Sequence, residues 1–233
     1  MAKESQVMII GDSYINWPTH TLPADLAQES GQTGWRLEAI GGSAMSSGGI
    51  AGFIPDQYTA SQARDADVHT VVMDGSGNDV LIPDITIDPF GSCKQDAKAD
   101  TLAQCKQIVS ASQATIEELF DQMAADGVRD VVYFWYPHVP TGTLLGGAYP
   151  NVISDYAKPL IGQTCTSTSV RTNGALRCQF VDMTPVFEGH DDWFFPGDIH
   201  PTSEGSAAMA KAIWQVMEDE CIGQVESSGC CTP

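Results

Sequence analysis

The stretch Val7-Met-Ile-Ile-Gly-Asp-Ser13 decides the fold expected of this chain. Its four apolar residues form a short uninterrupted run, which is typical of a parallel strand buried on both faces. Open α/β sheets place their functional groups in the crevice beyond the carboxyl ends of such strands. Ser13 is therefore predicted to face a crevice, although Gly-Asp-Ser also occurs in ordinary turns and helix caps.

Similar apolar or β-rich runs recur along the chain, separated by segments with helical periodicity. We predict strands at residues 7–10, 35–40, 68–73, 128–135 and 177–181. An apolar stripe predicts a helix from about Asp100 to Asp126, ended by Gly127, and a last helix follows Pro201 to about Glu218. Such alternation indicates an α/β fold with a mostly parallel sheet and helices on both faces.

Three irregular segments are expected to be long loops that shape a site: residues 82–98, 137–151 and 163–176. The chain has 233 residues, of which 42% are hydrophobic, and this suits one domain with a substantial core. We predict a single domain over residues 1–233, with a cysteine-containing polar tail from about residue 221.

A histidine suited to activate Ser13 lies in Pro196-Gly-Asp-Ile-His-Pro201. His200 can accept the proton of a serine hydroxyl, and a nearby carboxylate can hold its ring in the required tautomer. Asp198 is the preferred carboxylate. Asp191, Asp192 or a backbone carbonyl remain alternatives for the same task.

Two further segments carry donors suited to stabilise an oxyanion: Ala39-Ile-Gly-Gly-Ser43 and Met73-Asp-Gly-Ser-Gly-Asn-Asp79. Each is expected at a strand's end. A backbone N–H at a glycine and the side-chain amide of Asn78 are donor types found in oxyanion holes.

Together, these four segments resemble the signature blocks of the GDSL, or SGNH, hydrolase family, which supply a serine, a glycine, an asparagine and a histidine in that order. The resemblance spans residues 7 to about 217 and implies a flavodoxin-like α/β/α sandwich with a five-stranded sheet. It implies Ser13 as nucleophile and oxyanion donor, Gly42 and Asn78 as further oxyanion donors, and His200 as general base.

The chain departs from the family pattern at three points. Ser76 stands where the third block usually has glycine. Gly197 stands where the family usually places its aspartate, three residues before the histidine, which is why alternatives to Asp198 stay open. In the second block, a shifted register would make Ala44 the donor in place of Gly42.

These residues predict a serine esterase that forms and then hydrolyses an acyl-enzyme. Without a long apolar lid segment, we expect short acyl chains, including acetyl groups on carbohydrate. A lipase or lysophospholipase for longer chains, or a non-catalytic binding module, are the alternatives. Among the aromatic residues near the crevice, Trp17 and Phe195 are the preferred substrate contacts.

Composition limits the partners. The net charge of −19, with only 11 Lys and Arg, argues against nucleic acid, because phosphate binding relies on basic residues. No apolar run is long enough for a transmembrane helix, so we expect no stable membrane insertion. No metal or organic cofactor is implied, the expected substrate is a small-molecule or carbohydrate ester, and the oligomeric state stays open.

Seven cysteines favour an oxidising compartment. Short-range pairing would join Cys93 with Cys105, Cys165 with Cys178, and Cys221 with Cys230 or Cys231. We therefore expect a secreted or periplasmic protein, and since Met1-Ala-Lys-Glu-Ser5 is not a signal peptide, we expect that peptide to be absent from this sequence.

Overall fold

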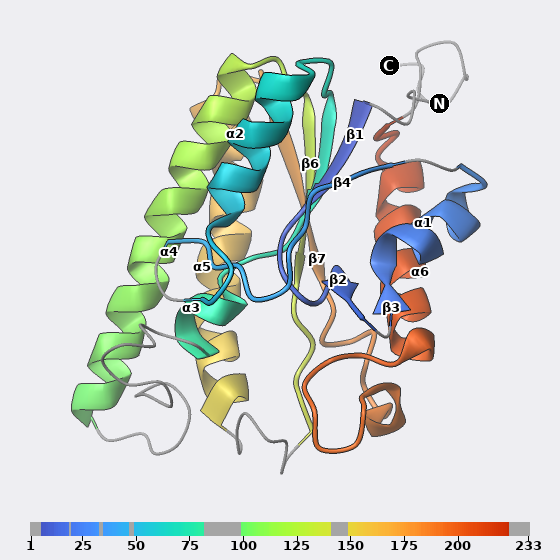
Figure 1. Ribbon diagram of the computed structural model, residues 1–233. Coiled ribbons are helices and arrows are strands. Elements are labelled where there is room, and N and C mark those ends of the chain that lie inside the picture. Colours follow the sequence, from blue (N-terminus) through green and yellow to red (C-terminus); the bar gives the residue numbers. More distant parts are fainter. Residues whose placement is uncertain are drawn as a thin grey trace.

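The computed structural model describes residues 6–18, 20–32, 35–46, 49–81, 99–140 and 149–223. Figure 1 shows a central sheet with helices on both faces. In chain order the elements are β1 Val7–Ile10, β2 Asn16–Trp17, β3 His20–Thr21, α1 Leu22–Ser30, β4 Arg36–Leu37, α2 Ile54–Arg64, β5 Thr70–Met73, α3 Gly77–Leu81, α4 Ala99–Ala125, β6 Asp130–Trp135, α5 Tyr149–Arg171, β7 Arg177–Asp182, the 3₁₀ helix η2 Asp191–Trp193 and α6 Ser203–Asp219.

The main sheet has five strands in the order β4-β1-β5-β6-β7, and every neighbouring pair is parallel. Numbered by their sequence along the chain, these strands lie in the flavodoxin-like order 2-1-3-4-5, whose direction of succession reverses between β1 and β5. This confirms the predicted fold class. Ligands of such sheets bind where the order reverses, and Ser13 follows β1 while Asn78 follows β5.

Helices cover both faces of the sheet. In Figure 1, α2, α4 and α5 lie on one side and α1 and α6 on the other. The two predicted helices are confirmed as α4 and α6. Gly127 ends α4 with a positive φ of 89°, and the N–H of Val128 reaches back to the carbonyl of Met123 at 3.0 Å.

The edge strand β4 is shorter than the predicted strand at residues 35–40. Only Arg36 and Leu37 pair with β1 as a strand. The next residues still follow β1, because the N–H groups of Glu38 and Ile40 donate to the carbonyls of Ile9 and Gly11. An edge position leaves one side of this segment without a neighbour, so regular pairing ends early.

The prediction of a loop at residues 163–176 is wrong, because α5 continues to Arg171. Threonines disfavour helix interiors, yet here their hydroxyls bond within the helix: Thr168 donates to the carbonyl of Thr164 at 2.8 Å, and Thr172 to that of Thr168 at 2.9 Å. Thr164 and Thr168 are buried, so packing overrides propensity. The predicted loop at 82–98, and residues 141–148 of the one at 137–151, lie outside the described residues.

One of the predicted disulfides is confirmed: Cys165 of α5 is bonded to Cys178 of β7, with Cα atoms 5.1 Å apart. Cys105 and Cys221 are also disulfide-bonded. Their expected partners, and residues 224–233 of the predicted tail, lie outside the described residues. Within the described part of the chain, no helix is long and apolar enough to cross a membrane.

Candidate active site

Ser13 lies in the turn that follows β1, and the backbone before it explains why glycine is needed. Gly11 has a φ of 145°, and a Cβ there would lie 1.9 Å from Oδ1 of Asp74. The turn is closed by N–H groups of Ile15 and Asn16, which both donate to the carbonyl of Asp12. Ser13 is thereby fixed at the carboxyl end of β1, buried except for 7% of its surface.

His200 and Asp198 lie in the loop between η2 and α6. Nε2 of His200 is 2.9 Å from Oγ of Ser13, and its Nδ1 is 2.7 Å from Oδ1 of Asp198. Burial alone would raise the pKa of Asp198, but the hydrogen bond and the charge of His200 outweigh it and hold this pKa below its usual range. The three predicted side chains thus form one continuous hydrogen-bonded series.

The alternative carboxylates lie elsewhere. Asp191 and Asp192 belong to η2 and are both exposed. Oδ1 of Asp192 lies 3.8 Å from Nδ1 of His190, a different histidine. Of the aspartates considered from the sequence, Asp198 is the one placed against His200.

The two aromatic residues expected to contact substrate have different surroundings. Trp17, in the small β2–β3 hairpin, stacks flat on His200, with ring centroids 3.9 Å apart and planes at 7°. Phe195 is half-buried, and its N–H donates to the carbonyl of His200. Both residues therefore pack around the histidine and its loop.

The second block places Gly42 in a positive-φ conformation, at 87°, where an added Cβ would lie 2.6 Å from the side chain of Ile50. Its carbonyl accepts from the N–H of Ile50 at 2.8 Å. The N–H of Ala44, the alternative donor, is engaged with the carbonyl of Gly52 at 3.0 Å. Within the described residues, the N–H groups of Gly42 and Ser13 donate no hydrogen bond.

Asn78 lies in the first turn of α3 and reaches back towards the other blocks. Its Nδ2 donates to the carbonyl of Ser43 at 2.8 Å and makes a long contact of 3.4 Å with Oδ2 of Asp12. Asp79 accepts from the N–H groups of Met45 and Ser46, both at 2.7 Å. The second and third blocks are therefore tied together.

Two buried carboxylates lie beneath Ser13. Oδ1 of Asp74 accepts from the N–H of Asp12 at 2.8 Å, and Oδ2 of Asp12 accepts from the hydroxyl of Tyr136 at 2.7 Å. Burial raises the pKa of both acids, and the charge of Asp12 raises that of Asp74 further. Among the described residues, no cluster of His, Cys, Asp and Glu is suited to hold a metal ion.

Sequence comparisons give no match to a protein-family model or to a curated protein. Comparison with solved structures does give matches. An extracellular lipase from Streptomyces rimosus superposes with a TM-score of 0.60 at 16% identity, over 90% of this chain and 98% of the lipase. A carbohydrate acetylesterase family member from Sinorhizobium meliloti superposes with a TM-score of 0.60 at 13% identity, over 94% of this chain and 99% of that protein. An acetylxylan esterase from Geobacillus stearothermophilus superposes with a TM-score of 0.52 at 15% identity, over 90% of this chain and 92% of that esterase.

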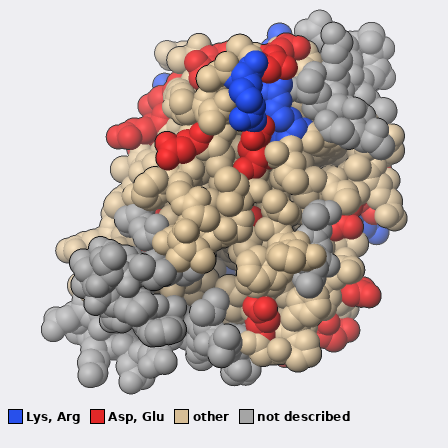
Figure 2. All heavy atoms as spheres, viewed as in Figure 1, with Lys and Arg blue, Asp and Glu red and all other residues tan. Residues whose placement is uncertain are grey.

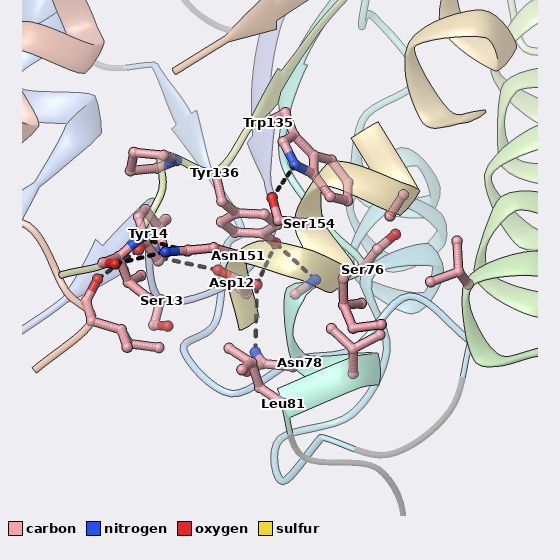
Figure 3. A pocket seen from close by; sticks show the side chains of 18 residues that line it. Asp12, Ser13, Tyr14, Ser76, Asn78, Leu81, Trp135, Tyr136, Asn151 and Ser154 are labelled. Carbon is pink, nitrogen blue, oxygen red and sulfur yellow. Dashed lines mark hydrogen bonds between the residues drawn. The ribbon is translucent and has the colours of Figure 1, made fainter. Parts of the chain in front are cut away.

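The chain has the SGNH-hydrolase fold. In this SGNH-hydrolase fold a cavity of about 60 Å³ opens beside Ser13. Figure 3 shows Asp12, Asn78 and Tyr136 around it, joined by hydrogen bonds. The other walls come from the end of β6 and from α3, α4 and α5.

Sequence reasoning did not identify the deeper parts of this site. Asp74 and Tyr136 meet Asp12 across 62 and 124 residues, and nothing local in the sequence marks such contacts. Val109 and Ala157 line the cavity from α4 and α5, where they look like ordinary core residues. Tyr136 itself was among the aromatic residues expected near the crevice, because it directly follows the apolar run of β6, but its contact with Asp12 was not predicted.

Proposed function

We propose that this chain is a serine esterase that hydrolyses carboxylic esters through an acyl-enzyme. The observation that carries the proposal is the series of contacts from Asp198 to His200 to Ser13, at 2.7 Å and 2.9 Å. A nucleophile within hydrogen-bond reach of a base, which is itself oriented by a third group, is the arrangement that serine hydrolysis requires.

In the first half of the reaction, Oγ of Ser13 attacks the ester carbonyl while Nε2 of His200 takes the hydroxyl proton. Asp198 holds the Nδ1 proton and stabilises the imidazolium that forms. When the tetrahedral intermediate collapses, His200 gives its proton to the departing alkoxide. Water then attacks the acyl-enzyme, with His200 again as base, and releases the acid and Ser13.

The oxyanion of the intermediate accepts hydrogen bonds from the N–H groups of Ser13 and Gly42. Neither N–H has a partner within the described residues. The third donor is the amide of Asn78, which exchanges its long 3.4 Å contact with Asp12 for the oxyanion. Such prearranged donors act where charge develops, and each contributes roughly 100-fold or more to the rate.

The structural neighbours support ester hydrolysis as the reaction. They include a lipase, a carbohydrate acetylesterase and an acetylxylan esterase, so they support lipid and carbohydrate esters alike. Export is part of the same proposal: the Cys165–Cys178 disulfide and the extracellular neighbour support a secreted or periplasmic protein.

Hydrolysis of p-nitrophenyl butyrate tests the proposal. Ser13→Ala should lower kcat/KM by at least about 1,000-fold, and a fluorophosphonate probe should label the wild type but not this variant. Ser110→Ala, which removes an exposed hydroxyl on α4, is the matched control and should keep both properties. Equal turnover by Ser13→Ala would refute the proposal, and a wild type without turnover or labelling would favour a binding module.

A further inference from the structure

The cavity beside Ser13 leads into the core of the molecule. Its far walls include Val109 of α4 and Ile153 and Ala157 of α5, which are at most 3% exposed. Figure 2 shows a hollow near the centre of this face, and the described residues around it are mostly uncharged. A group that enters from Ser13 therefore meets chiefly apolar surface.

The polar side chains in the cavity wall are already engaged. Nε1 of Trp135 donates to Oγ of Ser154 at 2.8 Å, as Figure 3 shows. Asn151 bonds both the N–H and the carbonyl of Val139 at 2.9 Å. The hydroxyls of Ser76 and Ser112 are hydrogen-bonded to each other. A sugar hydroxyl that entered would lose its hydrogen bonds to water, and few polar groups of the wall are free to replace them. Methylene groups make no hydrogen bonds to water, so they lose none on entering.

The reaction geometry decides which half of an ester faces this cavity. His200 must protonate the leaving alkoxide, so the alcohol has to lie beside His200. Ser13 and Asn78 belong to the cavity wall, but His200 does not. The space is therefore placed for the group bonded to the carbonyl carbon, which stays on Ser13 in the acyl-enzyme.

We propose that the cavity binds the acyl chain and selects acyl groups of about four to six carbons. This rests on the proposed esterase function and names its substrate class. The volume of about 60 Å³ is several times what a single water molecule needs. An acetyl group would leave most of this apolar space unfilled, so the chain preferred by the cavity is longer than acetyl.

Two ester series with the wild-type protein test the proposal. Along p-nitrophenyl acetate, butyrate and hexanoate, kcat/KM should rise about fourfold per methylene, or roughly 250-fold over the four methylenes, and then rise no further for dodecanoate. Along methyl, butyl and hexyl acetate it should change by less than about threefold, because the alcohol stays outside the cavity.

Ala157→Phe fills the far end of the cavity. It should lower the ratio of kcat/KM for hexanoate over acetate at least about tenfold. Ala111→Phe, on the exposed face of α4, adds the same side chain outside the cavity and should keep the wild-type ratio. If Ala157→Phe does not fold, Val109→Ala serves instead: it widens the cavity and should raise the ratio of dodecanoate to hexanoate.

The results separate this inference from the proposed function. If Ser13→Ala hydrolyses every ester as the wild type does, the esterase proposal itself fails. If turnover needs Ser13 but falls from acetate to hexanoate, follows alcohol length, or keeps its chain-length ratio in Ala157→Phe or Val109→Ala, only the acyl-chain inference is overturned.

Discussion

His200 is held from three directions. Ser13 and Asp198 contact its two nitrogens, and the ring of Trp17 covers one face at 3.9 Å. The stacked indole leaves the imidazole little freedom to rotate away from Ser13.

Replacing the aspartate tests how the imidazole is oriented. Asp198→Asn should lower kcat for ester hydrolysis on the order of 1,000-fold or more, because the amide favours the wrong tautomer of His200. Asp191→Asn and Asp192→Asn change two exposed residues of η2. They are the matched controls and should keep near-normal kcat. Comparable losses in a control, or normal turnover in Asp198→Asn, would show that another group orients the ring.

Only some of the contacts between individual residues of the site could be predicted from the sequence. Asp198 and His200 are two residues apart, so their contact was open to prediction. The contact between Asp12 and Asp74 was not, because it depends on the parallel pairing of β1 with β5. Trp17 was expected at the substrate, and its position on His200 comes from a hairpin of two-residue strands that carries little sequence signal.

Among the elements, the central strands were predictable because each is a continuous apolar run that can be buried on both faces. Val7–Ile10 and Thr70–Met73 are fully buried. Helix α5 was not fully predictable, because Pro159 interrupts its pattern and its second half is rich in threonine. Packing of Ile161 and Cys165 against the core stabilises a segment that propensity alone assigns to a loop.

The disulfide between α5 and β7 has a measurable effect on this part of the fold. Replacing both Cys165 and Cys178 with alanine should lower the free energy of unfolding by about 3 kcal/mol, because the bond closes a short loop and restricts the unfolded chain. Urea unfolding measures the difference. A change below about 0.5 kcal/mol would show that α5 and β7 stay joined without the bond.

For the whole molecule, the buried acids link folding to pH. Burial, and then the charge of Asp12, raise the pKa of Asp74 well above its usual value near 3.8. Above about pH 4 the unfolded chain has lost this proton while the folded protein keeps it. The contribution of Asp74 to stability is thus complete below pH 4 and declines as pH rises through its folded pKa.

Asp74→Asn removes this titration and keeps an oxygen that can accept from the N–H of Asp12. The variant should be more stable than the wild type at pH 8, and its stability should change less between pH 5 and pH 8. Urea unfolding at both pH values measures this, with the exposed Asp192→Asn as control. An unaltered pH dependence would mean that Asp74 is ionised in the folded protein throughout this range.

The contact between Ser13 and His200 joins positions 187 residues apart. Synthesis proceeds from the N-terminus, so the serine leaves the ribosome long before the histidine that would activate it. Every incomplete chain that ends before His200 lacks the base of the proposed reaction. If the proposed function holds, hydrolysis is therefore among the last properties that a growing chain acquires.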